Sequence, residues 1–200
     1  MTDVRLRELE LGRCRHGVMC WPKRDGTIGR ALGLYGEFAE GENRVMARYL
    51  KAGGVAVDVG ANLGTTALAL ARAVGELGQV IAFEPQPLMA QCLMTSLTLN
   101  EMYQVRLLST ALGSVRGWST MAALGVHVGG NYGAIGLGEG ELAVPVLTLD
   151  ELALPRLDVL KVDVEGYEWS VVQGAQGQVL RHRPYAITLH WCGLRLSVHA

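Results

Sequence analysis

The sequence predicts an α/β fold in which a central, mostly parallel sheet is flanked by helices. Two observations support this prediction: short β-rich apolar runs alternate with longer runs of helical periodicity, and most of the 26 glycines fall between these runs. At 200 residues the chain is long enough for one substantial core and too short for two ordinary domains. We therefore expect one structural unit, with an N-terminal cap segment at 1–50 and the main domain at 51–200.

The predicted elements follow one another in the order that this fold requires. The cap segment contains a hairpin-like turn at Arg24-Asp25-Gly26 and then a helix from Glu42 to Leu50. The main domain alternates strands, predicted at 55–59, 79–83, 105–109, 157–162 and 185–189, with helices, predicted at 65–74, 87–99 and 167–180. An insertion at about 113–148 begins with a glycine-rich stretch of weak periodicity. Such a long stretch without clear elements is usually functional or contains small strands.

Composition and charge exclude several classes of protein. Eighteen basic and nineteen acidic residues give a net charge of −1, which offers no broad electrostatic footprint for nucleic acid or an anionic membrane. No apolar run approaches the ~20 residues that a bilayer requires, and the amino terminus lacks a signal-peptide core. We therefore expect a cytoplasmic protein that acts on a small molecule. Buried thiols are favoured for the scattered cysteines, over a disulfide framework and over a zinc site at Cys14, His16 and Cys20.

A glycine-containing turn joins the first strand of the main domain directly to its helix. The segment reads Val57-Asp58-Val59-Gly60-Ala61-Asn62-Leu63-Gly64. Gly60 leaves room for a nucleoside, and Gly64 lets the helix begin tightly against the sheet. The exposed amides at the helix start, with the hydroxyls of Thr65 and Thr66 nearby, can hold a carboxylate. Alternatively, close packing of the helix against the strand would require the same glycines even if no ligand binds there.

Three further side chains complete the predicted cofactor site. Asp58 is placed to face an ammonium group of the ligand, directly or through water. Glu84 ends the second strand and can accept hydrogen bonds from both hydroxyls of a ribose. Asn62 stands near where a glycine would have to admit a pyrophosphate, so the segment lacks the Gly-x-Gly-x-x-Gly fingerprint of dinucleotide sites. The sequence therefore favours a nucleoside cofactor without a pyrophosphate, with Asn62 among its binding residues.

Acidic residues follow the fourth strand at the carboxyl edge of the sheet, where open α/β folds bind ligands. Asp163 is the first candidate for a general base and Glu165 the second, and the pair could alternatively hold a divalent metal, although a site without metal is favoured. In a purely structural interpretation Asp163 caps the next helix and Glu165 lies in its first turn. His190, at the end of the fifth strand, is a third candidate base or a histidine tucked under the C-terminus. Lys161 is expected to be solvated or ion-paired, with no catalytic role.

Four segments together resemble the FkbM family of methyltransferases. They are the glycine-containing turn at 57–64, Phe83-Glu84-Pro85, Ala111-Leu112-Gly113, and Leu160-Lys161-Val162-Asp163-Val164-Glu165-Gly166-Tyr167-Glu168. The resemblance implies a Rossmann-like class I methyltransferase fold, S-adenosyl-L-methionine as cofactor, and methylation of a hydroxyl on a small molecule, secondary metabolite or saccharide. It also implies a substrate-binding role for Asn131, which matches a family position in the insertion.

The C-terminal end departs from the family pattern. His190-Trp191 stands where the family usually has an acidic residue, and nine residues follow Trp191, fewer than the usual last helix and two strands need. We expect a sheet shortened at the C-terminus, a fragment, or a sheet completed by a partner such as a second copy of the chain. The alternative function is a non-catalytic or incomplete methyltransferase-like binding or assembly module. An NAD-dependent oxidoreductase is disfavoured by the missing fingerprint and by the absence of an obvious Tyr-x-x-x-Lys pair.

Overall fold

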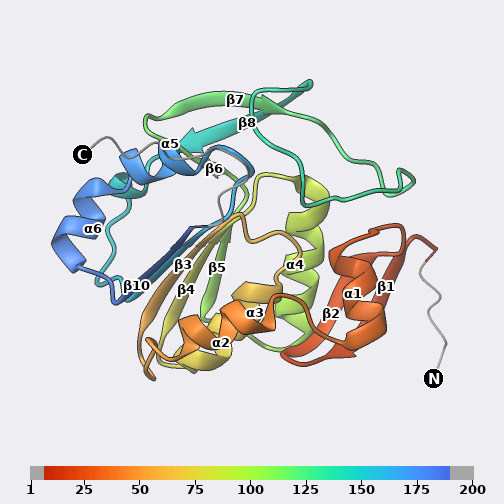
Figure 1. Cartoon of the computed structure of the whole chain (residues 1–200), viewed down its shortest axis with the longest axis horizontal. Helices are drawn as coiled ribbons and strands as arrows, with labels where there is room; N and C mark the ends of the chain where they lie inside the picture. The colour runs from red at the N-terminus through yellow and green to blue at the C-terminus, as the bar shows by residue number, and fades with distance from the viewer. Residues whose placement is uncertain (1–6, 190–200) are drawn as a thin grey trace.

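A five-stranded parallel sheet forms the centre of the chain in the computed structural model, which describes residues 7–189 (Figure 1). Its strands are β3 (Val55–Val59), β4 (Gln79–Phe83), β5 (Val105–Leu108), β9 (Val159–Val162) and β10 (Ala186–Leu189). They are hydrogen-bonded in the order β10-β9-β3-β4-β5. From β3 the chain first builds outward through β4 and β5, and then returns to build β9 and β10 on the other side. This is the Rossmann-like order, whose switch point lies between β3 and β9, and it confirms the predicted fold class.

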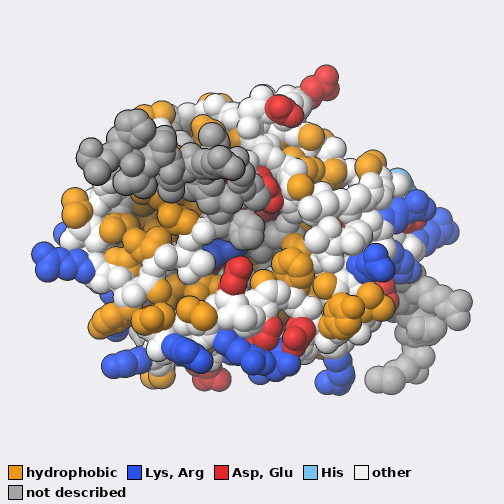
Figure 2. Space-filling model, in the orientation of Figure 1, with side chains coloured by type: hydrophobic (Ala, Val, Ile, Leu, Met, Phe, Trp, Pro, Cys, Tyr) orange, Lys and Arg blue, Asp and Glu red, His pale blue; other side chains and the backbone are white. Residues whose placement is uncertain are grey.

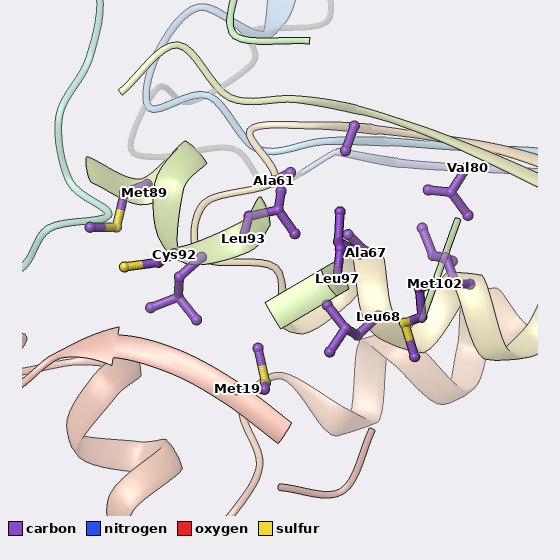
Figure 3. Close-up of a cluster of buried hydrophobic side chains, with 14 of the residues drawn as sticks. Met19, Ala61, Ala67, Leu68, Val80, Met89, Cys92, Leu93, Leu97 and Met102 are labelled. Atoms are coloured by element: carbon purple, nitrogen blue, oxygen red, sulfur yellow. The ribbon is translucent and has the colours of Figure 1, made fainter. Parts of the chain in front are cut away.

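Helices cover both faces of this sheet. The helices α3 (Thr65–Val74) and α4 (Pro87–Leu99) cover one face, while α5 (Glu168–Gln173) and α6 (Gln176–His182) cover the other. Because side chains alternate along a strand, Ala56 belongs to the first core and its neighbour Val57 to the second. Figure 3 shows the first core, where Leu68 of α3 and Leu93 of α4 meet Met19 from the N-terminal hairpin.

The N-terminal segment packs its hairpin onto α4. Strands β1 (Leu9–Cys14) and β2 (Gly17–Pro22) are antiparallel, and Asn100, just after α4, both accepts from the Val18 amide at 2.8 Å and donates to the Val18 carbonyl at 2.6 Å. The prediction of a hairpin-like turn at 24–26 is wrong, because the hairpin turns between β1 and β2. The Asp25 carboxylate instead accepts from the amides of Thr27 (3.0 Å) and Gly29 (2.8 Å), and so stabilises the start of a helix.

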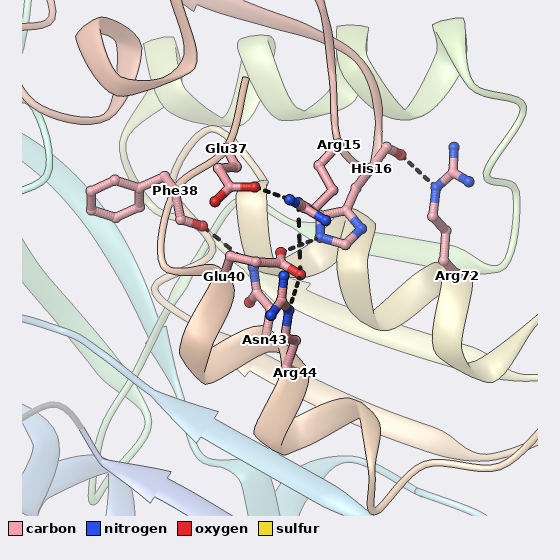
Figure 4. A network of polar contacts seen from close by, with 8 residues as sticks. All are labelled: Arg15, His16, Glu37, Phe38, Glu40, Asn43, Arg44 and Arg72. Atoms are coloured by element: carbon pink, nitrogen blue, oxygen red, sulfur yellow. Dashed lines mark hydrogen bonds and ion pairs between the residues drawn. The ribbon is translucent and has the colours of Figure 1, made fainter. Parts of the chain in front are cut away.

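Two short helices follow this hairpin, namely α1 (Ile28–Tyr35) and α2 (Glu40–Ala47). The second begins two residues before the predicted start at Glu42 and ends three before Leu50. A polar network ties α2 to the hairpin turn: Glu40 pairs with His16 at 2.8 Å and with Arg44 at 3.1 Å, and Arg15 pairs with Glu37 (Figure 4).

The insertion contains most of a second, three-stranded sheet. It is formed by β6 (Ala111–Leu112), β7 (Gly117–Met121) and β8 (Leu142–Leu147), in the order β6-β8-β7. A 3-10 helix, η1 (Leu149–Glu151), follows. The connection from β7 to β8 is fixed at several points: Gln86 donates to the Ala122 carbonyl at 3.0 Å, and the Gly26 amide donates to the Gly130 carbonyl at 2.9 Å. The insertion thus contains small strands and a long, anchored loop.

The helix predicted over 167–180 is two helices. They meet at Gly174 and Ala175, where a Cβ atom on Gly174 would lie 2.0 Å from the carbonyl oxygen of Gly113. The Gly174 carbonyl also accepts a hydrogen bond from the Asp150 amide at 2.9 Å, so this point is bound to the insertion. The prediction of one continuous helix is therefore wrong, because a tertiary contact interrupts it.

The visible surface mixes side chains of all types. Figure 2 shows acidic, basic and hydrophobic side chains interspersed on one face of the molecule. Within residues 7–189, no helix combines the length and the apolar character needed to cross a bilayer.

Candidate functional site

A cavity of about 380 Å³ lies at the carboxyl edge of the central sheet, beside the switch point. This volume is in the range of small-molecule sites. The sheet side of its lining includes Gly60, Asn62, Thr65, Thr66, Glu84, Lys161, Asp163 and Glu165. The N-terminal helices and the insertion complete the lining with Ile28, Phe38, Glu42, Asn131, Tyr132, Ile135 and Leu137, among others. The topology thus brings together most of the residues that the sequence singled out.

The two glycines of the turn are required by packing around the cavity. Gly60 has a φ of +80°, and a Cβ there would lie 1.8 Å from the carbonyl oxygen of Asp163. Gly64 has a φ of +103°, and a Cβ there would lie 2.4 Å from Leu93 of α4. The close neighbour at Gly64 is therefore a helix, where the sequence predicted the sheet. In both cases the missing side chain admits a neighbouring part of the protein itself.

Glu84 is held in a fixed orientation by two backbone amides. Asn62, in the left-handed conformation at φ 51°, donates its amide to Glu84 Oε2 at 2.8 Å, and Gln86 donates to Oε1 at 2.7 Å. Burial raises the pKa of Glu84 to about 7, although these two hydrogen bonds act in the opposite direction. Each carboxylate oxygen retains a lone pair, so Glu84 can still accept two hydroxyl groups from a ligand. This arrangement fits the diol of a ribose.

The start of α3 offers backbone donors to the same cavity. Thr65 and Thr66 both line the cavity, and Gly64 at the N-cap has no side chain to satisfy the first amides. The first amides of a helix lack intrahelical acceptors, and the helix dipole adds positive potential there. The helix start therefore fits a ligand carboxylate.

Asp58 lies beneath the cavity. Its side chain is fully buried and is not part of the cavity lining. The expected contact with a ligand ammonium, directly or through water, stays a prediction. Its Oδ1 lies 3.2 Å from Nζ of Lys161. The contact is an ion pair without good hydrogen-bond geometry, since neither Asp58 oxygen has a hydrogen-bond partner. Burial raises the pKa of Asp58 in spite of the lysine.

Lys161 is a buried cavity residue to which sequence reasoning gave no catalytic role. Its side chain is buried and the residue lines the cavity, contrary to the expected solvated lysine, although the expected pairing with an acid is confirmed. Burial would lower the pKa of Lys161, but Asp58 and Asp163 outweigh it, so the pKa lies above its ordinary value. The acids Asp58 and Asp163 at the ends of predicted parallel strands were a signal that Lys161 could be buried among them. Using this signal requires knowing that the strands of Asp58 and Lys161 are neighbours.

The two candidate acids after β9 both line the cavity. Asp163 is about one third exposed, and its amide donates to the Val59 carbonyl at 3.0 Å. Glu165 follows in the left-handed conformation at φ 49°. The structural alternative is wrong, because α5 begins only at Glu168 with Tyr167 as its N-cap. Asp163 therefore does not cap the helix and Glu165 does not lie in its first turn.

The remaining candidates differ in where they lie. Asn131 lines the cavity, and its Oδ1 accepts from the Gly133 amide at 3.0 Å. His190 falls outside the described residues. Across residues 7–189, no group of three or more His, Cys, Asp or Glu could hold a metal ion. In the Cys14, His16 and Cys20 segment, His16 pairs with Glu40.

The chain is similar to known methyltransferases. Residues 58–197 match the family model described as the methyltransferase FkbM domain. Among solved structures, a methyltransferase FkbM from Methylobacillus flagellatus KT has 18% identity and a TM-score of 0.48, covering 68% of this chain and 32% of that chain. An S-adenosylmethionine-dependent O-methyltransferase from Thermotoga maritima has 16% identity and a TM-score of 0.42, covering 84% of this chain and 62% of that one. This chain thus spans about a third of the first structure's length. A comparison with curated proteins gave no match.

Proposed function

Because this chain belongs to the methyltransferase FkbM domain family, we propose that it is an S-adenosylmethionine-dependent methyltransferase. The acceptor is a hydroxyl oxygen on a small molecule, a secondary metabolite or a saccharide. The observation that carries the proposal is the orientation of Glu84 in the cavity, where two backbone amides hold a buried carboxylate ready for a ribose. We assign the other residues that line the cavity to binding the rest of the cofactor and to the reaction with the acceptor.

The cofactor site consists of groups at the ends of β3 and β4 and at the start of α3. Glu84 binds the ribose hydroxyls, and the amides and hydroxyls around Thr65 bind the methionine carboxylate. Gly60, Asn62 and Gly64 shape the turn between them, as their positive φ angles require. Asp58 acts from below the cavity, through the ammonium group of Lys161. When bound, the cofactor supplies an electrophilic methyl group on a sulfonium.

The acceptor side of the site needs a group that takes a proton. An alcohol loses its proton when its oxygen is methylated, and a carboxylate within hydrogen-bond reach can accept it. Asp163 is the first candidate and Glu165 the second, since both line the cavity. Asn131 is placed to orient the acceptor from the insertion. Much of the rate acceleration then comes from holding the hydroxyl in line with the methyl group.

Calorimetric titration tests the cofactor half of this proposal. Wild-type protein is titrated with S-adenosylmethionine, S-adenosylhomocysteine and NAD, beside Glu84→Ala and the matched exposed control Glu76→Ala. We expect binding of the first two ligands, little binding of NAD, and a loss confined to Glu84→Ala. Preferential binding of NAD, or equal binding by both variants, would contradict the proposed site.

Transfer of a labelled methyl group tests the catalytic half. Protein, S-adenosylmethionine with a ¹³C methyl group, and a panel of hydroxylated metabolites and saccharides are incubated, and products are assigned by mass spectrometry and NMR. We expect an O-methyl product that Asp163→Asn diminishes. Cofactor binding with no transfer to the panel would favour the alternative of a non-catalytic binding or assembly module.

A further inference from the structure

Lys161 joins three groups at the carboxyl ends of two neighbouring strands. Its Nζ donates to the carbonyl oxygen of Gly60 at 2.9 Å, and lies 3.2 Å from Asp58 Oδ1 and 3.5 Å from Asp163 Oδ2. An ammonium group has three N–H bonds. One of these bonds is used for the Gly60 carbonyl, and the two carboxylates are held as ion pairs, while the side chain is only 8% exposed.

The register of the sheet produces this cluster. Asp58 of β3 lies directly beside Lys161 of β9, so their side chains share one face of the sheet. Asp163 follows two residues later and projects to the same side. Elsewhere this face is apolar, with Ala56 beside Val159. The charged groups are therefore confined to the carboxyl end of the face, beside the cavity.

Stability alone gives a poor reason for this cluster. Removing two charges from water costs several kcal/mol per ion, and an apolar replacement of similar size is often neutral or stabilising. Asp58 is also left without a well-formed hydrogen bond. Buried groups of this kind, at the edge of a ligand cavity, are more typical of functional sites.

We infer that Lys161 is a positioning residue for the methyl transfer proposed above, on which this inference rests. Its ammonium group holds the Asp163 carboxylate and the Gly60 carbonyl in one geometry, with Asp58 balancing its charge from below. The acceptor oxygen forms its bond to the methyl carbon, the carbon–sulfur bond breaks with its electron pair left on sulfur, and the hydroxyl proton passes to Asp163. Lys161 keeps its proton throughout and touches the reaction only through Asp163 and the turn.

Two variants separate positioning from simple charge balance. Lys161→Met leaves Asp58 and Asp163 facing each other without a cation, whereas Asp58→Asn/Lys161→Met removes both members of the buried pair and keeps Asp163. Two controls accompany them. Lys51→Met removes an exposed lysine, and Asp158→Asn removes a buried carboxylate at the amino end of β9, where it accepts from the Val55 amide at 2.8 Å.

Binding of S-adenosylmethionine and methyl transfer are measured for every variant as functions of pH. Transfer by the wild type tests the proposed function, and the comparison among variants tests the role of Lys161. We expect Lys161→Met to lower kcat by about 100-fold, a typical contribution of a well-placed general base. The pH–rate profile of Lys161→Met is expected to differ from that of the wild type, because the cation 3.5 Å from Asp163 Oδ2 is gone. The double variant is expected to be more stable and to bind the cofactor better than Lys161→Met. Its kcat and its pH–rate profile are expected to remain different from those of the wild type.

Two results would overturn the inference. The first is a wild-type kcat and pH profile in the double variant, which would reduce Lys161 to a counter-ion of Asp58. The second is a Lys161→Met profile that coincides with those of Lys51→Met and Asp158→Asn.

Discussion

The buried carboxyl of Glu84 predicts a pH-dependent affinity for the cofactor. Its pKa of about 7 means that the carboxyl is largely protonated at pH 6 and largely ionised at pH 8. A ribose diol donates two hydrogen bonds, so it binds the ionised form. If binding requires that form, the apparent Kd contains the factor 1 + 10^(pKa − pH), and affinity at about pH 6 is roughly tenfold weaker than at about pH 8.

The assay is calorimetric titration with S-adenosylhomocysteine at intervals across this range. Glu84→Gln cannot ionise, so its affinity is expected to be independent of pH here and to be weaker than that of the wild type at the alkaline end. Hydrogen bonds to charged groups contribute about 1.5–3 kcal/mol, which corresponds to roughly 10- to 100-fold in Kd. Glu76→Ala, exposed and remote from the cavity, is expected to follow the wild-type curve.

Stability of the ligand-free protein has the opposite pH dependence. The pKa of Glu84 is raised from 4.5 to about 7, so the folded state binds more protons than the unfolded state between these values. The contribution of Glu84 therefore becomes less favourable as pH rises through this window, by about 3 kcal/mol in total. Urea unfolding at both ends of the window measures the pH slope of stability, from which the Glu84 contribution is absent in Glu84→Gln. An affinity constant within twofold across the range, or equal slopes for wild type and Glu84→Gln, would refute the reasoning.

Three further substitutions test the fold around the cavity. Gly60→Ala forces a Cβ against the Asp163 carbonyl at a positive φ, and we expect a loss of at least about 3 kcal/mol in chemical unfolding; Gly33→Ala, with open space around it, serves as the control, and equal effects would contradict the packing. Tyr132→Phe removes hydroxyl contacts with the carbonyls of Val128 and Gly125, so amide hydrogen exchange in the loop between β7 and β8 accelerates severalfold while the core stays protected. Glu40→Gln weakens the network of Figure 4 by about 1 kcal/mol at neutral pH. Burial would raise the pKa of Glu40, but His16 and Arg44 lower it below the ordinary 4.5, so the stability difference between variant and wild type vanishes in acid. Equal stability at neutral pH, or a difference that persists in acid, would contradict a role of these ion pairs.

The regular part of the fold follows from local sequence. The bounds of β3, α3, β4 and α4 agree with the sequence prediction residue for residue. These elements have strong local signals, such as the three valines of β3 and the proline at the first position of α4. Local propensity and tertiary packing favour the same structure here, so the pattern was sufficient.

The two failures depend on contacts that hydrophobic periodicity does not describe, one distant in the sequence and one local. The break at Gly174 exists because the Gly113 carbonyl occupies the space beside it, 61 positions earlier in the sequence. The turn at Asp25 is typical of a hairpin in composition, and only the carboxylate contacts to Thr27 and Gly29 distinguish it as a helix start. The spacing of apolar residues predicts neither of these contacts.

The sequence predicted which residues line the cavity better than it predicted how they contact one another. Glu84, Asp163 and Glu165 line one cavity because parallel strands end at a common edge, which sequence reasoning could use. The burial of Asp58 and its ion pair with Lys161 depend on the pairing of β3 with β9. Strand order is a global property, so an ion pair that lies across two strands is not visible in either strand alone.

The two walls of the cavity differ in how closely they are tied to the central sheet, and this difference matters for redesign. On the sheet side a side chain at Gly60 would collide with the carbonyl oxygen of Asp163, so Gly60 cannot be exchanged without moving the segment after β9. The opposite wall comes from α1, α2 and the loop between β7 and β8, which share no strand with the central sheet. Transplanting this outer wall between relatives therefore offers a modular route to new acceptors, whereas mutations spread over the sheet edge would damage catalysis and folding together.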